Sequence, residues 1–234
     1  MKFFTFTYNG FIEWPYLMVK LSNFIKMTDN SKSNYEEIMI DPGVYDLKDS
    51  DHFSWEGSID IKEFLDSLKP NEFFSFDYPG DMNPKLRDHF LERSWDNAIR
   101  YCYHPQYIVA VQYPFNNYWW FTYWFDKYRE LPHTSGILGI GNLCKQRGCN
   151  EFVKHALDYI ILNLPLDVET IHIYGPNKTI IKYIQKLENL GKVKFSIDSR
   201  KWEYYKPTKE RPFWFHKYLY SLREMGVIIK EGSE

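Results

Sequence analysis

The sequence has few cysteines, no long apolar run and almost no net charge. Three cysteines among 234 residues make no disulfide framework, which indicates a reducing compartment. No apolar stretch approaches the roughly 20 residues of a membrane span, and the N-terminus lacks the apolar core of a signal peptide, so we expect a soluble, intracellular protein. With 29 Lys+Arg against 31 Asp+Glu, only a local basic patch would bind nucleic acid.

Aromatic side chains are abundant where those features are scarce. They make up 19% of the residues, including 8 tryptophans and 19 tyrosines, which suits both a compact core and rings that line surfaces. The length fits one large α/β barrel or two small domains, and no low-complexity linker divides the chain. We therefore expect a single domain over residues 1–234, with a basic and aromatic C-terminal segment at about residues 199–234.

Apolar runs alternate with longer helical patterns along the chain. The predicted strands are residues 1–8, 37–41, 73–77, 107–112, 136–141, 170–174 and 193–198. The predicted helices are residues 15–24, 60–68, 84–101, 115–131, 150–164, 178–190 and 213–225, with a loop at 26–34. This order predicts parallel strands buried on both faces and a TIM-type (β/α)8 barrel. Seven strands are evident, so either the eighth lies within residues 9–36 or the barrel is incomplete; an open doubly wound sheet is the alternative.

The glycine-rich stretch at residues 135–149 reads as a buried strand followed by a turn and a helix start. Its glycines let the backbone approach a ligand closely. A dinucleotide fingerprint would need a third glycine where Cys144 stands, and an acidic residue at a strand end where Asp158 lies in a helical run. The pattern therefore does not favour a dinucleotide site.

Four predicted strands end in a carboxylate or amide side chain: Asp41, Asp77, Gln112 and Asp198. In parallel barrels the chemistry lies at the carboxyl ends of the strands, so we expect these side chains to meet. A single aspartate there is often a helix cap or turn residue, but four together indicate a site. The set has no histidine, which argues against a triad hydrolase.

Paired carboxylates are typical of glycosyl transfer, with one as the nucleophile and the other as the acid and base. A further aspartate and a glutamine suit reading the edge of a heterocyclic base. Tyr45 and Tyr174 follow two of these strand ends, and we expect them to sandwich a planar ligand.

These residues resemble motifs of the tRNA-guanine transglycosylase superfamily, which includes the queuine and archaeosine enzymes. The resemblance is closer to the DNA-modifying relatives that exchange guanine for a 7-deazaguanine. Residues 41–45 are similar to the family's Asp-Ser-Gly-Gly-aromatic motif, and residues 136–142 to its Gly-Gly-Leu-Ala-Val-Gly-Glu strand. Asp77 and Gln112 look like its base-reading pair, and Asp198 looks like its nucleophile. The resemblance covers residues 37–200.

The resemblance implies a role for each of these residues. Asp198 attacks the anomeric carbon and holds a covalent nucleic-acid intermediate, while Asp41 acts as general acid and base. The base would be a free 7-deazaguanine such as 7-cyano-7-deazaguanine, and no cofactor is expected. The residues implied to bind it are Asp77, Gln112, Tyr45, Tyr174, Asn142 and the backbone at Ile137 and Leu138.

The sequence departs from the family pattern in three ways. Asn142 stands where the family has glutamate, and Pro42 where it has serine. The tRNA enzymes carry a Cys-x-Cys-x-x-Cys zinc motif after the nucleophile, and none follows Asp198 here. Cys144, Cys149 and His155 have an unsuitable spacing, so we expect no metal. Without the zinc insertion, DNA is favoured over tRNA as the partner.

Basic residues gather between residues 178 and 217, where eleven lysines and arginines face four acidic residues. Aromatic rings are interleaved with them, a combination that suits phosphate binding and base stacking, although a solvated basic face has the same composition. The candidate nucleic-acid-binding residues are Arg200, Lys201, Trp202, Lys206, Lys209 and Arg211. A base in a helix would have to be flipped out to reach the strand ends.

Other functions remain open from the sequence. They are a catalytically silent nucleic-acid-binding barrel, a tRNA-guanine transglycosylase, and a small-molecule glycosidase or phosphate-handling enzyme. The sequence does not specify the incoming base, the nucleotide context or the oligomeric state, a homo-oligomer included.

Overall fold

The computed structural model describes residues 1–6, 12–43, 46–47, 49–80, 83–114, 117–142, 150–191, 193–199 and 210–232. Its strands are β1 (Lys2–Phe4), β2 (Tyr16–Lys20), β3 (Glu37–Asp41), β4 (Glu72–Phe74), β5 (Val109–Val111), β6 (Ile137–Ile140), β7 (Thr170–Ile173) and β8 (Lys194–Asp198). All pairs that these strands form are parallel. The predicted α/β class with parallel strands is thereby confirmed.

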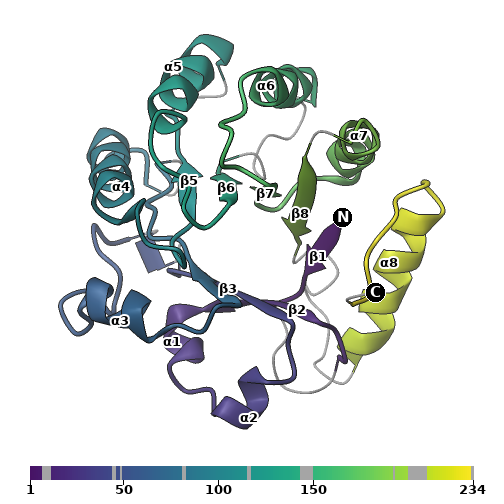
Figure 1. Ribbon diagram of the computed structural model, residues 1–234, viewed down its shortest axis with the longest axis horizontal. Helices are drawn as coiled ribbons and strands as arrows, with labels where there is room; N and C mark the ends of the chain where they lie inside the picture. Colours follow the sequence, from purple (N-terminus) through teal and green to yellow (C-terminus); the bar gives the residue numbers. More distant parts are fainter. Residues whose placement is uncertain are drawn as a thin grey trace.

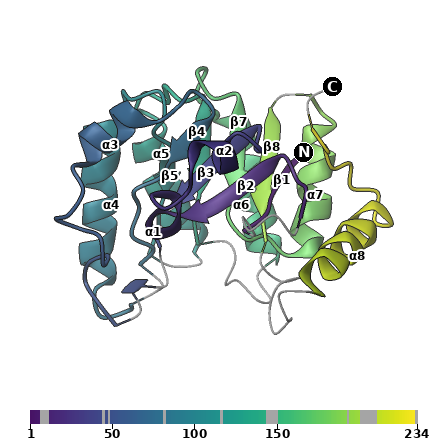
Figure 2. The ribbon, with the colours of Figure 1, turned by 90° about the horizontal axis from the view of Figure 1, so that it is seen from below.

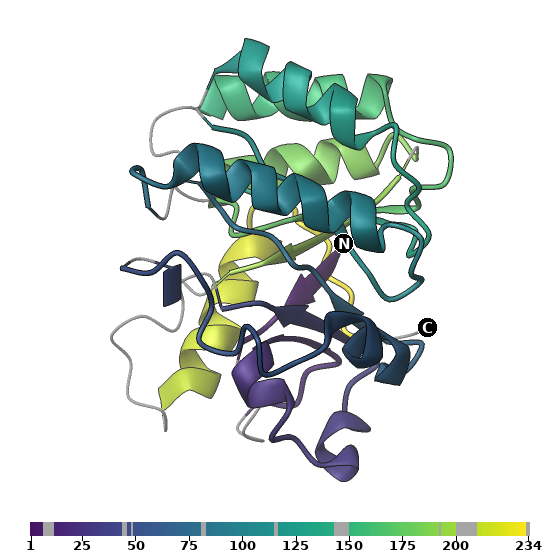
Figure 3. The same cartoon turned by 90° about the vertical axis from the view of Figure 1, so that its left-hand side faces the viewer.

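Helices surround the strands on the outside, as Figure 1 shows. They are α1 (Leu21–Phe24), α2 (Asp29–Lys32), α3 (Ile61–Ser67), α4 (Arg87–Tyr101), α5 (Tyr118–Tyr128), α6 (Asn150–Leu162), α7 (Lys178–Glu188) and α8 (Arg211–Arg223). Figures 1 and 2 place α8 beside β1 and α7, where Phe3 packs against Phe215 and Lys178 donates to Ser221. Figure 3 shows α4 next to α5.

The strands form two sheets, one with the order β1-β8-β7-β6-β5 and one with the order β2-β3-β4. Neither sheet closes on itself. Single parallel bridges link the two sheets on both sides, Thr5 with Leu17 and Phe74 with Tyr107. At the first link Met18 N–H donates to Thr5 O at 2.8 Å, and at the second Ile108 N–H donates to Phe74 O at 2.9 Å.

The prediction of a helix over residues 15–24 was wrong, because β2 occupies its first half and only the short α1 follows. Residues Tyr16 to Val19 are all buried, and a short apolar run fits a buried strand as well as a helix. Pairing with β3 along its whole length makes it a strand. The eighth strand therefore lies within residues 9–36, which was one of the two alternatives that the sequence left open.

The segment expected as a loop at residues 26–34 contains α2. The Thr28 side chain caps this helix by accepting from Ser31 N–H. The tryptophan-rich helix begins later than expected, because Asn117 accepts hydrogen bonds from Trp119 and Trp120 and so caps it.

One continuous apolar core contains buried residues from Met1 to Ile229. The largest fully buried side chains are all tyrosines and phenylalanines, which accounts for much of the aromatic content. Other rings remain exposed, among them Tyr103 at 73% and Trp119 at 72%. The aromatic residues thus serve both of the purposes expected from the composition.

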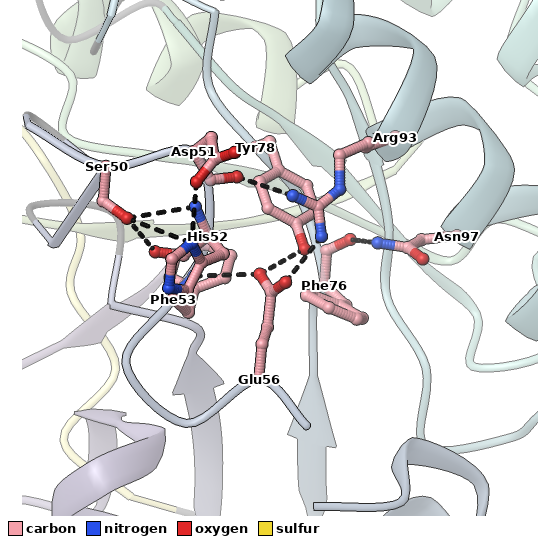
Figure 4. A network of polar contacts seen from close by, with 9 residues as sticks. All are labelled: Ser50, Asp51, His52, Phe53, Glu56, Phe76, Tyr78, Arg93 and Asn97. Atoms are coloured by element: carbon pink, nitrogen blue, oxygen red, sulfur yellow. Dashed lines mark hydrogen bonds and ion pairs between the residues drawn. The ribbon is translucent and has the colours of Figure 1, made fainter. Parts of the chain in front are cut away.

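A polar network joins the loop after β3 to α4 and to the chain after β4 (Figure 4). Glu56 accepts from Tyr78 Oη at 2.5 Å and pairs with Arg93 at 2.5 Å. The Arg93 guanidinium lies 4.1 Å from the Tyr78 ring centre and donates to Asp51 O. Burial and Glu56 raise the pKa of Tyr78. Since Tyr78 directly follows Asp77, the network holds the backbone next to that carboxylate.

We expect Glu56→Ala to lower the free energy of unfolding by about 1–3 kcal/mol, because the partly buried Arg93 loses its charge partner and Tyr78 its acceptor. Urea unfolding measures the loss. Lys62→Ala is the matched control, because Lys62 forms an exposed ion pair with Asp66 and we expect a cost of about 0.5 kcal/mol or less. Equal costs for the two variants would mean that the network contributes no more than an ordinary surface pair.

Candidate functional site

The polar residues predicted to meet lie at the carboxyl ends of four parallel strands. Asp41 and Asp198 are the last residues of β3 and β8, Gln112 directly follows β5, and Asp77 follows β4. Asp77, Gln112 and Asp198 are buried, and Asp41 is half-buried. The side-chain contacts show how close together they are.

Asp77 and Gln112 form a direct pair. Gln112 Nε2 donates to Asp77 Oδ2 at 2.6 Å, and both side chains are buried, with 1% of Gln112 exposed. The other amide atom, Gln112 Oε1, is buried without a hydrogen-bond partner among the described residues. A buried acceptor in this state is costly unless a ligand supplies a donor, so Gln112 Oε1 marks where an N–H group would bind.

The Asp77 carboxyl is easily protonated. Burial and the nearby charge of Asp41 raise the pKa of Asp77 to about 7, although hydrogen bonds with Ser75 and Gln112 act in the opposite direction. Near neutral pH this side chain therefore exists in both forms. It can accept hydrogen bonds from a ligand and can also donate one.

Tyr174 lies among the three carboxylates. Burial raises the pKa of its phenol well above the usual value, and the charges of Asp77, Asp41 and Asp198 add to this effect. A hydrogen bond with Ser75 lowers it in part. All three acids therefore lie close enough to Tyr174 for their charges to affect its phenol.

Asp198 is held through one of its two oxygens. Asp198 Oδ1 accepts from Gly175 N–H at 2.9 Å and lies 3.4 Å from His172 Nε2. Asp198 Oδ2 has no hydrogen-bond partner within the described ranges. The Tyr218 hydroxyl of α8 is close to Asp198 and is buried without a hydrogen-bond partner among the described residues. The described contacts of the Asp198 carboxylate are thus all made by Oδ1.

The reasoning from sequence missed His172 and Ser75. Both precede a predicted site residue by two positions, and in an extended chain residues i and i+2 lie on one side. The His172 and Tyr174 rings are indeed 4.5 Å apart. This sequence spacing is the signal that could have found them. The four polar strand ends include no histidine, as expected, but His172 lies beside one of them, Asp198.

Two glycines of β6 and its end make room for the site residues. A Cβ at Gly139 would lie 3.0 Å from Tyr174 Cε2, and a Cβ at Gly141 would lie 2.2 Å from Gln112 Nε2. The expectation was that these glycines let a ligand approach the backbone. In the structure the space beside them is filled by Tyr174 and Gln112, so the glycines allow those two side chains to pack.

Asn142 follows Gly141 and has a left-handed backbone with φ of 60°. Asparagine tolerates this conformation better than most residues, which gives a physical reason for its presence where the resembled family has glutamate. Its side-chain Nδ2 donates to Tyr113 O at 3.0 Å, on the chain just after Gln112.

Ile137 and Leu138 lie at the beginning of β6, whereas the site residues lie level with its end. Their ladder partners on β7 are Thr170 and Ile171, and both side chains are buried. Along the strand they lie about 10 to 13 Å from Gly141, toward the N-terminal end of β6. The structure does not bring these two residues together with Asp77 and Gln112.

Several predicted residues lie outside the described residues: Tyr45, Arg200, Lys201, Trp202, Lys206 and Lys209, together with Cys144 and Cys149. Of the predicted nucleic-acid-binding set, Arg211 is described, and it begins α8 in a half-buried position. Among the residues with described positions, no group of histidine, cysteine and acidic side chains could hold a metal ion. None of the described helices is long and apolar enough to cross a bilayer.

Comparison with known proteins gives no further assignment. The chain matches no protein-family model, no curated protein and no solved structure. The residues at the strand ends and their geometry are therefore the basis for inferring a function.

Proposed function

We propose that this protein is a nucleic-acid transglycosylase that replaces guanine with a 7-deazaguanine derivative, in DNA rather than in tRNA, through a covalent aspartyl intermediate. One observation carries the proposal: Asp41, Asp77 and Asp198 follow or end parallel strands, all three influence the phenol of Tyr174, and Gln112 donates a hydrogen bond to Asp77. This is the combination of nucleophile, acid and base-reading pair that base exchange needs.

The proposed architecture is one closed TIM-type barrel. Support comes from the eight parallel strands, which follow chain order around the two sheets, and from the bridges that link the sheets on both sides. In a closed barrel the carboxyl ends of all eight strands would open on one face, where the four polar residues are found.

In the first half of the reaction, Asp198 Oδ2 attacks C1′ of the target nucleotide. The C1′–N9 bond breaks as the C1′–O bond forms, and a proton from the Asp41 carboxyl goes to the departing guanine. In the second half, ionised Asp41 takes the N9 proton of the incoming base, which attacks C1′ and releases Asp198. Every bond that breaks is replaced, and no oxidant or cofactor is consumed.

Asp77 and Gln112 would recognise the base edge. The unpartnered Gln112 Oε1 would accept one N–H of the base, and Asp77 would accept or donate according to its protonation. Guanine and 7-deazaguanines share the same pyrimidine-ring edge, so one pair of residues would serve the departing and the incoming base.

Exposed rings on α5 offer a stacking surface for unpaired bases. Trp119, Trp120 and Tyr123 are 72%, 40% and 48% exposed, and Lys127 Nζ lies 4.5 Å from the Trp124 ring centre. This helix follows the strand that precedes Gln112. Aromatic rings beside a cation suit single-stranded nucleic acid, which supports a flipped or unpaired target base.

The direct test is incubation of the protein with labelled guanine and with duplex DNA, single-stranded DNA or tRNA in parallel. We expect label to enter DNA and to be chased out by unlabelled 7-cyano-7-deazaguanine. Label in tRNA alone would support the tRNA enzyme instead. Binding of nucleic acid without any incorporation would indicate a catalytically silent binding protein, and neither binding nor incorporation would overturn the proposal.

A further inference from the structure

His172 lies beside Asp198 in the interior of the sheet. Its side chain is fully buried within β7, its Nδ1 is 2.9 Å from Ser196 Oγ, and its Nε2 is 3.4 Å from Asp198 Oδ1. The ring centre is 4.5 Å from that of Tyr174 and 5.6 Å from that of Phe4. The hydrogen bond with Ser196 and the two ring contacts therefore fix the orientation of the imidazole, while Nε2 is buried without a hydrogen-bond partner among the described residues.

Ser196, His172 and Asp198 do not form a hydrolase triad. Ser196 is completely buried on β8, so no substrate carbonyl can reach its hydroxyl. Its hydroxyl contacts Nδ1, and either atom can be the donor. When Ser196 Oγ–H donates to Nδ1, the imidazole proton lies on Nε2 and points to Asp198.

We propose that His172 is a positioning residue for Asp198. His172 Nε2 and Gly175 N–H both face Asp198 Oδ1, which holds the carboxylate so that Oδ2 is the oxygen that attacks C1′. This inference rests on the proposed function, because it assigns the attacking oxygen. At 3.4 Å the two atoms do not form a hydrogen bond in the structure, and we expect one to form when the nucleotide is bound.

Among the described residues, the other titratable groups close to Asp198 are Tyr174, which directly follows β7, and Tyr218 on α8. Both are phenols, which are neutral below pH 9 or so, particularly when buried. His172 Nε2 is therefore the side-chain nitrogen that the described contacts place beside Asp198.

The experiment compares His172→Asn with His172→Gln. A glutamine amide reaches the position of Nε2 and keeps a donor for Asp198, whereas an asparagine amide reaches only the position of Nδ1 beside Ser196. We expect His172→Asn to slow adduct formation by about 10- to 100-fold, with the KM for guanine unchanged. His172→Gln should recover most of the rate.

Equal rates for the wild type and both variants would overturn the proposal. So would an equal loss in both variants together with lost guanine binding, because a structural role would then explain the result. Failure of the proposed function is separable. If the wild type forms no adduct, crystal structures of the wild type and both variants still decide: an Asp198 carboxylate whose orientation changes in His172→Asn alone supports the positioning role, and an unchanged orientation in His172→Asn refutes it.

Discussion

Asp198→Asn is expected to abolish the covalent protein–nucleic acid adduct and to reduce base exchange by about 10⁴-fold or more. An amide oxygen is a far weaker nucleophile than a carboxylate, and the covalent route requires the bond to C1′. Gly175 N–H can still donate to the amide oxygen, so we expect the fold to persist. The adduct is measured as a band that remains joined to labelled DNA under denaturing conditions.

The matched control for this experiment is Asp158→Asn on α6. Asp158 accepts a hydrogen bond from the Tyr183 hydroxyl and is remote from the four polar strand ends. We expect this variant to form adduct at the wild-type rate. An adduct that survives in Asp198→Asn would assign the nucleophile to another residue, with Asp41 the first to be examined.

Asp77→Asn is expected to stabilise the protein above pH 7 while impairing base binding. The folded pKa of about 7 lies above the unfolded value of about 3.9, so the group favours folding at low pH and that contribution is lost as pH rises from about 4 to about 7. The difference corresponds to at most about 4 kcal/mol at pH 8. Asparagine stays neutral and avoids this loss.

Urea unfolding at pH 4 and pH 8 measures the effect. We expect Asp77→Asn to match the wild type at pH 4 and to be more stable by about 2–4 kcal/mol at pH 8. We also expect its KM for guanine to rise by about tenfold or more. A carboxylate can accept N–H groups at both of its oxygens, whereas an amide has only one acceptor oxygen. A stability difference that is the same at both pH values would contradict the raised pKa of Asp77.

The predicted effect of Asp77→Asn means that the buried Asp77 carboxylate lowers the free energy of unfolding above pH 7. Asp77 is buried near the charge of Asp41 and close to Tyr174, an arrangement that places acidic groups together. Proteins retain such arrangements mainly at functional sites, where an altered pKa serves the chemistry. The combination of higher stability and lower binding in Asp77→Asn would be the signature of that compromise.

The strand-end residues were predictable because their positions follow from local rules. An apolar run that ends in aspartate or glutamine before a proline or glycine predicts a strand end, and parallel strands expose their carboxyl ends on one side. Asp41, Asp77, Gln112 and Asp198 were found in this way. Residues 15–24 were misread because a short apolar run has no local feature that separates a strand from a buried helix, and its pairing partner β3 lies further along the chain.

The sequence by itself determined the α/β class, the order of most elements and the four polar strand ends, because these depend on periodicity and on neighbouring residues. Only the tertiary structure decided what surrounds those residues. It set His172 against Asp198, Ser75 against Tyr174 and the Gln112 amide over Gly141. Each of these contacts joins residues that belong to, or directly follow, different strands. Such contacts depend on how the strands pair and align across the sheet, which no local pattern in the sequence specifies.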